Sequence, residues 1–334
     1  MTDIVEEITG TSIEEVVDRK NVVMDATFLT SLMNCPRKSQ FQFEMNLQPI
    51  RGKSNSLETG SIVHKFMEIY YRSLILGLDK KTAVQYGMAA AELYINGCKH
   101  CTDYVPIPEQ LKPICGHPIN EYPGVKNTPP ENTNEPYLII GWQWVLKTCE
   151  QYAEFYRNDH WIPLESEVVK RKILYADESM RIMWKAKLDL TVDTNQGIYP
   201  CDHKTMKQRR DGNKLVNQFK GQCLIMGTQR VIINKVGFQT TLKPEEKFTR
   251  NVVSYSQNQL DEWRETTLPY YAAMLITYNE TGYWPPNYSN CEAKYGKCPF
   301  LSVCESDPEM RQEELQKNFI VGPKWDPINE GNDD

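Results

Sequence analysis

The chain has 334 residues, 40% of them hydrophobic and 25% charged, which is typical of a globular protein with one large domain or two modest ones. Its net charge of −6 excludes a uniformly basic nucleic-acid coat, so any contact with a polyanion must come from a local patch. The acidic N-terminus has no apolar leader and no apolar run is long enough to span a bilayer, so we expect a cytoplasmic protein without membrane contact.

The N-terminal part of the chain is expected to be an acidic arm followed by helices. Residues 1–24 are acidic and form the arm, and residues 25–48 are expected to be helical, with Asp25 or Thr27 as the N-cap. After Gly60, the stretch SIVHKFMEIYYRSLIL has apolar residues at helical spacing, which predicts a second helix with one apolar side.

Residues 97–136 differ from their surroundings. They are rich in Pro, Gly, Asn and Cys and show little periodicity, which predicts an insertion or a small metal-pinned module. A Cys-x-x-Cys pair followed by a further Cys and a His has spacing that suits zinc, and loosely placed free thiols are the alternative. These four residues are Cys98, Cys101, Cys115 and His117.

The second half of the chain alternates between helical and strand-like segments. Helices are predicted over 141–157, 214–227 and 257–280, and strands over 164–174, 181–192, 198–204, 229–239 and 247–254. This order predicts an α/β protein, and no internal repeat is present.

The segment RIMWKAKLDLTVDTNQGIYPCDHKT carries the strongest local signal for chemistry. Its first strand alternates with period two, which puts Asp189 on the polar face, and DTNQG then reverses the chain. On the next strand Asp202 and Lys204 share a face while His203 points the other way. Two neighbouring carboxylates repel each other unless a cation lies between them, so the hairpin predicts a Mg²⁺ or Mn²⁺ site beside a lysine. Solvated surface charges are the alternative, because Asp-x-Lys is a common pattern.

A basic stretch follows this hairpin directly. In KTMKQRRDGNK the charged side chains after the hairpin lysine are Lys207, Arg209, Arg210 and Lys214. In an acidic protein this is where we expect a phosphate backbone to lie, and a solvated loop is the alternative.

Four separate stretches together resemble the PD-(D/E)XK nuclease superfamily, specifically its RecB-like branch with an iron–sulfur cluster. They are LTSLMNCPRKSQF, GSIVHKFME, the hairpin segment and CEAKYGKCPFLSVC, which lie between residues 29 and 304 in the order of that branch. The branch includes the AddB nuclease domain, CRISPR-associated RecB-like exonucleases and phage nucleases. The resemblance implies a mixed central sheet flanked by helices over 25–290, with 97–136 inserted, and a cysteine cluster segment with an acidic tail over 291–334.

Carried over residue by residue, the resemblance implies a catalytic centre. His64, Asp189, Asp202 and the backbone carbonyl of His203 would bind the metal ion, and Lys204 would orient or activate the attacking water. A helix-surface histidine is the alternative for His64. The resemblance also implies two residues near this centre: Glu167, which would approach the metal or a water, and Gln218, which would contact DNA. Glu167 could instead be a solvated strand residue, and Gln222 stands where the branch usually has tyrosine.

The remaining cysteines form a second group. Reduced thiols in a cytoplasmic chain indicate metal or iron–sulfur ligands more than disulfides. Three lie near the C-terminus, and the resemblance supplies the fourth, which gives Cys35, Cys291, Cys298 and Cys304 as ligands of a [4Fe–4S] cluster. A structural zinc is the alternative. In either case the expected role is to tie the N-terminal segment to the C-terminal one.

Together these features predict a metal-dependent deoxyribonuclease, most consistent with an exonuclease in recombination, repair or replication of a phage or microbial genome. The chain has no P-loop, so the substrate is expected to be a single strand or a free end, with a helicase, single-strand-binding or recombination protein as partner. Two alternatives stay open: a catalytically inactive DNA-binding subunit with a nuclease fold, and a zinc-dependent interaction protein built on residues 97–117.

Overall fold

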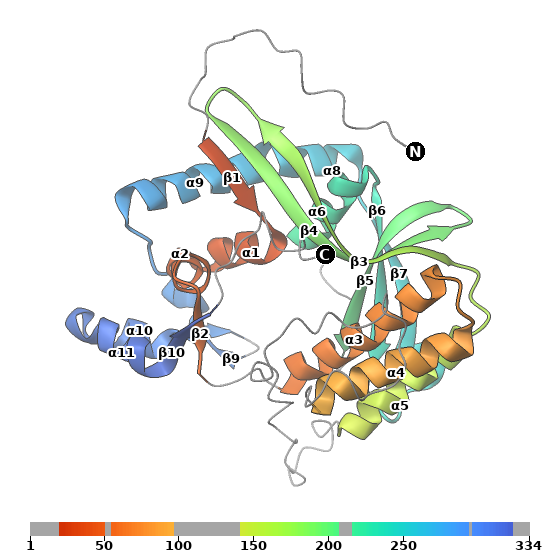
Figure 1. The fold of residues 1–334 in the computed structure, drawn as a ribbon. Helices are drawn as coiled ribbons and strands as arrows, with labels where there is room; N and C mark the ends of the chain where they lie inside the picture. Colours follow the sequence, from red (N-terminus) through yellow and green to blue (C-terminus); the bar gives the residue numbers. More distant parts are fainter. Residues whose placement is uncertain (1–19, 51–54, 97–140, 207–215, 294–295, 323–334) are drawn as a thin grey trace.

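One mixed β-sheet forms the centre of the protein in a computed structural model that describes residues 20–50, 55–96, 141–206, 216–293 and 296–322 (Figure 1). Its strand order is β1-β4-β5-β6-β7, with β3 also paired to β4. The pairs β1–β4 and β5–β6 are parallel and the other three are antiparallel. The strands are β1 (Lys20–Met24), β3 (Ile162–Ala176), β4 (Met180–Thr194), β5 (Gly197–Met206), β6 (Arg230–Gly237) and β7 (Phe248–Ser254).

Strand β4 has different neighbours along its length. β3 pairs with one edge of β4 along most of the strand, whereas the other edge pairs with β1 over Met180–Trp184 and with β5 over Leu190–Thr194. Between these two stretches, residues 185–189 have no strand partner on that edge within the described ranges. The sheet therefore splits at the middle of β4, and β1 and β5 diverge from it (Figure 1).

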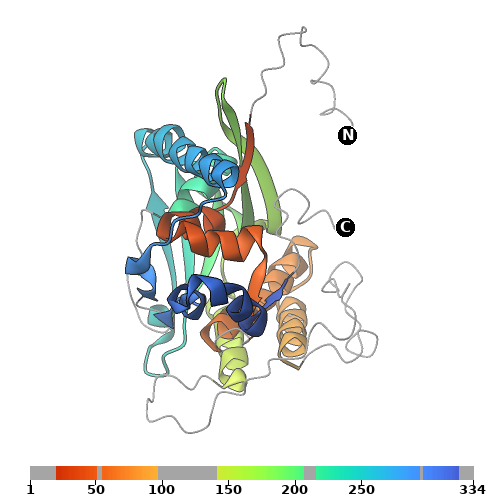
Figure 2. The same cartoon turned by 90° about the vertical axis from the view of Figure 1, so that its left-hand side faces the viewer.

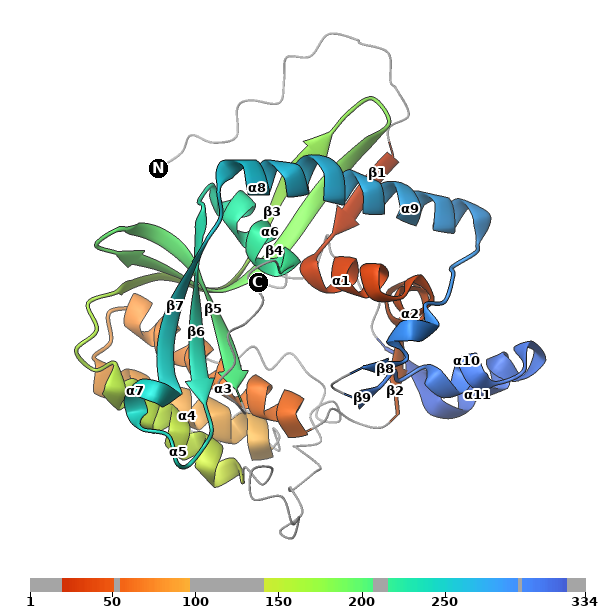
Figure 3. The same cartoon turned by 180° about the vertical axis from the view of Figure 1, so that it is seen from behind.

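Two groups of helices cover the sheet, each with its own apolar core (Figures 1 and 3). α3 (Asn55–Ile75), α4 (Lys80–Asn96) and α5 (Trp142–Phe155) pack with the β5–β7 half. The second group packs around Trp184 and β1, and consists of α1 (Ala26–Asn34), α6 (Asn217–Met226), α8 (Gln257–Glu262), the π-helical η3 (Trp263–Thr267) and α9 (Leu268–Thr281). α7 (Pro244–Lys247) precedes β7.

A third, smaller core joins the two ends of the described chain. Strand β10 (Phe319–Val321) pairs antiparallel with β2 (Leu47–Pro49), and the Phe300 ring stacks on Phe319 with centroids 4.6 Å apart. Figure 2 shows the C-terminal helices beside α1 and α2. The elements of this region are α2 (Pro36–Ser39), η1 (Gln40–Glu44), η4 (Tyr288–Asn290), β8 (Glu292–Ala293), β9 (Gly296–Lys297), α10 (Leu301–Glu305), η5 (Pro308–Met310) and α11 (Arg311–Asn318).

The structure confirms the mixed α/β architecture and the five predicted strands, whose ends it extends or trims by at most two residues. Asp25 caps α1 as predicted, accepting from the Phe28 amide at 2.7 Å. The helix predicted over 25–48 was wrong in extent: it breaks at Cys35, because Pro36 favours an extended residue before it.

The structure contains two further elements that the sequence patterns do not predict, a strand and a helix. The last residues of the expected N-terminal arm, Lys20–Met24, form β1, because β4 offers them a parallel partner far along the chain. Helix α4 was not predicted at all; its alanine-rich sequence packs on α3, where Gly87 lies against the Phe66 ring. No helix in the described ranges is long and apolar enough to cross a membrane.

Candidate active site

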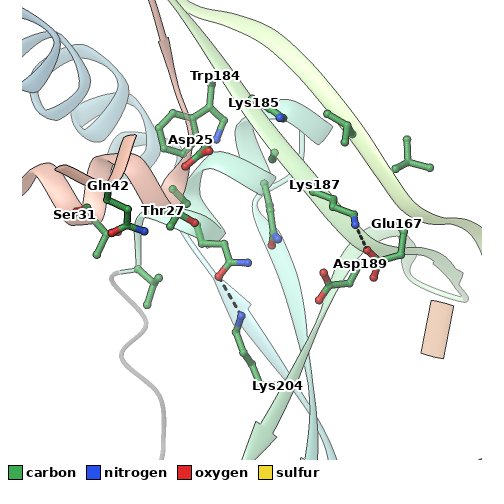
Figure 4. A pocket seen from close by; sticks show the side chains of 18 of the residues that line it. Asp25, Thr27, Ser31, Gln42, Glu167, Trp184, Lys185, Lys187, Asp189 and Lys204 are labelled. Atoms are coloured by element: carbon green, nitrogen blue, oxygen red, sulfur yellow. Dashed lines mark hydrogen bonds and ion pairs between the residues drawn. The ribbon is translucent and has the colours of Figure 1, made fainter. Parts of the chain in front are cut away.

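The split in the sheet opens onto a cavity of about 1200 Å³ (Figure 4). One wall is formed by β3 and β4, including Glu167, Lys187 and Asp189, and the opposite wall by the polar side of α1. Lys204 of β5 points into the same space. The α1 wall carries Thr27, Thr30, Ser31 and Asn34, and these small polar side chains leave the cavity wide and hydrophilic.

Three potential metal ligands converge at one end of this cavity. His64 comes from α3, Glu167 from β3 and Asp189 from β4, and one ligand atom of each lies within 4.8 Å of the others. His64 Nδ1 is 3.8 Å from Glu167 Oε1 and 3.7 Å from Asp189 Oδ2. Glu167 Oε1 is buried and accepts no hydrogen bond from any described residue. One imidazole and two carboxylates with an unsatisfied buried oxygen fit a divalent cation.

The backbone at Glu167 is strained in a way that aims its side chain. Its φ of 58° lies in the left-handed region, which non-glycine residues rarely adopt. Ser166 and Val168 pair with Leu190 and Leu188, so Glu167 lies opposite Asp189. Such a conformation costs of order 1–3 kcal/mol and clusters at functional sites, consistent with selection for the position of this carboxylate.

Electrostatics in this group favour a cation. Burial raises the pKa of Asp189 to about 7, with repulsion from Asp202 adding to it. Burial opposes protonation of His64, but Glu167 and the two aspartates outweigh it and raise the His64 pKa. Burial also acts to raise the pKa of Glu167, yet His64 and Lys187 hold it at about 2. Asp189 is thus the carboxylate whose charge its neighbours leave uncompensated, so a cation beside it is favoured.

Asp202 and Lys204 lie beside this group and bind each other. Asp202 is fully buried, and its Oδ2 is 2.7 Å from Lys204 Nζ. From α6, Gln218 Nε2 donates to Asp202 Oδ1 at 2.6 Å and Gln218 Oε1 accepts from Lys204 at 3.1 Å. The buried Gln222, one helical turn later, also donates to Asp202 Oδ1, at 3.4 Å. The two glutamines therefore fix the carboxylate that faces the lysine.

His203 links the two groups through its backbone. Its amide donates to Asp189 Oδ2 at 2.8 Å, and its carbonyl oxygen is 3.1 Å from His64 Nε2. Continuing the β4–β5 register from Leu190 and Cys201 puts Asp189 across from Asp202, as the hairpin pattern predicted. Gly197, with a φ of 129° that a residue with a side chain rarely adopts, ends the turn that sets this register.

The tertiary structure brings together every sequence-predicted residue of this centre that it describes: His64, Glu167, Asp189, Asp202, His203, Lys204 and Gln218.

Two residues that contribute to the centre were not predicted from the sequence. Lys187 pairs with Glu167 Oε2 at 2.6 Å, and its period-two spacing from Asp189 was the available signal. Gln222 donates to Asp202 Oδ1. Its four-residue spacing from Gln218, which puts both side chains on one helix face, was the available signal. The basic stretch with Lys207, Arg209, Arg210 and Lys214, and the group with Cys98, Cys101, Cys115 and His117, lie outside the described residues.

We expect divalent-metal affinity at this site to fall at least about tenfold per pH unit below pH 7. A metal ion binds the ionised Asp189, whose pKa is about 7, so protons compete increasingly as the pH falls through that value. The raised pKa of His64 acts in the same direction. Titration of Mn²⁺ by calorimetry at several pH values measures the slope. A pH-independent affinity in the wild-type protein would exclude Asp189 and His64 as ligands, and Asp189→Asn serves as the control with a weak affinity and a smaller slope.

The four cysteines expected to act together lie around the third core. Cys298 donates its backbone amide to the Cys291 carbonyl at 2.7 Å, and Asn287 donates its amide to Cys35 Sγ at 3.3 Å. Burial raises the pKa of Cys291, and the charges of Cys298, Cys304 and Cys35 add to that shift. No three of these sulfur atoms lie within 4.8 Å of one another, since the group at His64 is the one such set among the described residues.

Comparison with known proteins gives a family assignment. The family model described as the PD-(D/E)XK nuclease superfamily matches residues 26–305. None of the curated proteins matches the chain. A solved structure entitled "Crystal structure of SSO0001" is similar over 38% of this chain, with 12% sequence identity and a TM-score of 0.23. This chain spans 60% of the length of that structure, and the likeness is too low to bear on the fold.

Proposed function

Because this chain belongs to the PD-(D/E)XK nuclease superfamily, we propose that it is a divalent-metal-dependent deoxyribonuclease that removes nucleotides from single-stranded or free DNA ends. The observation that carries the proposal is the convergence of His64, Glu167 and Asp189, with Asp202 and Lys204 beside them, on one end of a large polar cavity. Lysines pair with Glu167 Oε2 and Asp202 Oδ2, but the buried Glu167 Oε1 stays unsatisfied beside Asp189, which favours a bound cation there.

The residues divide the work of phosphodiester hydrolysis between them. His64, Glu167, Asp189, Asp202 and the His203 carbonyl would hold Mg²⁺ or Mn²⁺. A divalent ion bound there supplies Lewis-acid stabilisation of phosphoryl oxygens and a water with a lowered pKa. Lys204 lies on the cavity side of Asp202, where its ammonium orients the attacking water and offsets charge on the phosphate. Gln218 and Gln222 hold Asp202 in place by hydrogen bonds.

Cleavage of end-labelled DNA tests the proposal. The wild-type protein is incubated with linear single-stranded, linear double-stranded and circular single-stranded DNA, with Mg²⁺ or Mn²⁺ and with EDTA. Metal-dependent loss of label from linear strands, with circles left intact, is the expected result. Cleavage of the circular DNA would show that the protein is an endonuclease and not an exonuclease. DNA binding without cleavage in any metal would instead favour an inactive nuclease-fold binding subunit.

The β3–β4 wall also supports a contact with the substrate phosphates. Lys187 lines the cavity two residues before Asp189 on the same face of β4, and its side chain is 57% exposed. Lys185, two residues further back, lines the same wall. A strand lying along β4 would meet the exposed Lys187 ammonium in sequence with the metal ligands, whereas Lys185 is buried. This path complements the basic stretch at 207–214 that the sequence predicts.

Replacing Lys187 by methionine is expected to raise the KM for DNA about tenfold, as for loss of one charge-assisted hydrogen bond. It should also flatten the salt dependence of binding by about one unit of slope. Lys170→Met is the matched control, because Lys170 also pairs with a glutamate of β3, Glu165, at 2.8 Å but does not line the cavity. KM and binding at several salt concentrations check this; equal effects in the two variants would remove Lys187 from the substrate path.

We further propose that Cys35, Cys291, Cys298 and Cys304 bind a [4Fe–4S] cluster that ties α1 and α2 to the C-terminal segment. The order and spacing of the four cysteines along the chain support it, as does the amide that Asn287 donates to Cys35 Sγ, which links the two segments. The spacing of these cysteines, which is similar to that of the RecB-like branch, favours the cluster over a structural zinc, whose ligands usually come in tighter sequence pairs. We also propose that the enzyme acts in DNA recombination, repair or replication.

A further inference from the structure

His203 is a buried polar residue to which the proposed chemistry gives no side-chain role. It lies on β5 between Asp202 and Lys204, but its ring is on the other face of the sheet and is 2% exposed. Burial of a polar ring is unfavourable unless its polar atoms are hydrogen-bonded, and among the described residues Nδ1 has a partner whereas Nε2 has none, so the Nδ1 contact should explain why the residue is histidine.

A closed circuit of contacts surrounds the His203 ring. Tyr71 of α3 stacks on it, with centroids 5.7 Å apart and planes 11° apart. Asn234, which pairs with His203 in the β5–β6 register, places its side-chain nitrogen 2.9 Å from His203 Nδ1. The same amide donates to Tyr152 Oη at 2.8 Å, and Tyr152 Oη is 2.6 Å from Tyr71 Oη. Elements α3, α5, β5 and β6 thus meet through four side chains.

The tyrosine at the centre of this circuit is fixed from the sheet edge. Arg250 of β7 donates to Tyr152 Oη at 3.4 Å and forms an ion pair with Asp159. Its guanidinium lies between the rings of Tyr156 and Trp161, 3.7 and 3.8 Å from their centroids. Stacking on two rings and pairing with a carboxylate hold the arginine in one conformation. The circuit is therefore anchored rather than free to repack.

The backbone of His203 connects its fixed ring to the proposed metal ligands. Its amide donates to Asp189 Oδ2 at 2.8 Å, and its carbonyl oxygen lies 3.1 Å from His64 Nε2. A shift or rotation of the ring would move this peptide, and both ligands with it. Outer residues that orient metal ligands typically contribute 10–100-fold to metal affinity or activity.

We propose that Asn234, Tyr152 and Tyr71 are positioning residues that hold the His203 ring, and through its peptide fix Asp189 and His64 for metal binding. The inference rests on the proposed metal site. It assigns the histidine side chain a task separate from the reaction: it links the catalytic hairpin to the far face of the sheet. Because the Asn234 side-chain nitrogen lies 2.9 Å from His203 Nδ1, the neutral ring accepts at Nδ1 and carries its proton on Nε2.

Metal binding without DNA provides the test. Mn²⁺ affinity is measured by electron paramagnetic resonance for the full-length wild type, Asn234→Leu and Tyr152→Phe, at a temperature where circular dichroism shows each folded. Both variants are expected to bind Mn²⁺ about 10–100-fold more weakly. Ser73→Ala is the matched control: it removes a buried hydroxyl from α3, the helix that carries Tyr71, but one that donates to the Ile69 carbonyl, and it should bind Mn²⁺ like the wild type.

A second readout needs no metal. The chain has five histidines, so long-range ¹H–¹⁵N correlation spectra of the metal-free protein can resolve the His203 ring. We expect an Nε2–H tautomer in the wild type and loss of that fixed state in Asn234→Leu. Wild-type Mn²⁺ affinity in both folded variants would overturn the proposal, even if their melting temperatures fall. If the wild type itself binds no Mn²⁺, the proposed function fails and this inference fails with it.

Discussion

Replacing Lys204 by methionine is expected to lower kcat for DNA cleavage by about 10²–10³-fold, the effect of removing one preorganised charge beside a reacting group. Lys204 Nζ is 2.7 Å from the buried Asp202 and is held by Gln218 Oε1 and the Phe219 ring. Because this geometry exists before substrate binds, its loss should affect the chemical step more than binding. Single-turnover cleavage of labelled DNA measures the step, and fluorescence anisotropy with EDTA measures binding.

Two comparisons make this prediction specific. Gln218→Met removes the amide that bridges Asp202 and Lys204 while leaving the lysine in place, so it should reduce kcat less than Lys204→Met. Lys204→Arg keeps the charge but changes its shape, and should recover only part of the rate. Equal cleavage by wild type and Lys204→Met would show that the activity comes from another site or a contaminant.

Replacing Cys298 by serine is expected to abolish the visible absorbance and iron content of the purified protein. Loss of the proposed cluster should lower the free energy of unfolding by more than about 4 kcal/mol, since it would tie together the N- and C-terminal segments of the small third core. The third core, built on Phe41, Phe300 and Phe319, is small, so we expect it to open first. Iron and sulfide analysis, absorbance spectra and limited proteolysis near the C-terminus check this.

Cys223→Ala is the matched control for losing a thiol. Cys223 is buried in the core around Trp184, and its replacement should cost about 1 kcal/mol while iron content stays constant. Iron retained in Cys298→Ser would remove Cys298 from the ligand set. If the wild-type protein contains zinc and no iron, the site is a structural zinc site and not a cluster. The proposed catalytic centre at Asp189 and Asp202 does not depend on that result.

The sequence could predict the local part of the catalytic centre because β-strands have a fixed period. Alternation along RIMWKAKLDLTVD put Asp189 on one face, and the two-residue spacing of Asp202 and Lys204 put them together. The turn before Gly197 then fixed the register that brings Asp189 across from Asp202. Each step depends on neighbours only a few residues away.

Contacts that join distant segments depended on more than local pattern. The sheet splits at β4 because β1 and β5 each pair with only part of one edge, and no alternation in β4 announces this gap. The left-handed backbone of Glu167 is tolerated because the β3–β4 ladder holds the residues on both sides of it.

Sequence by itself thus determined the strand faces, the hairpin, the helix cap at Asp25 and the residue types able to bind a cation. Only the tertiary structure decided that His64 meets Glu167 and Asp189, that Gln222 and Lys187 join them, and that His203 is held by Asn234. The physical reason is the distance along the chain over which each signal acts. Hydrophobic periodicity determines the direction of side chains only within one strand or helix. Which elements meet is instead set by burying apolar surface and satisfying buried polar groups across the whole fold.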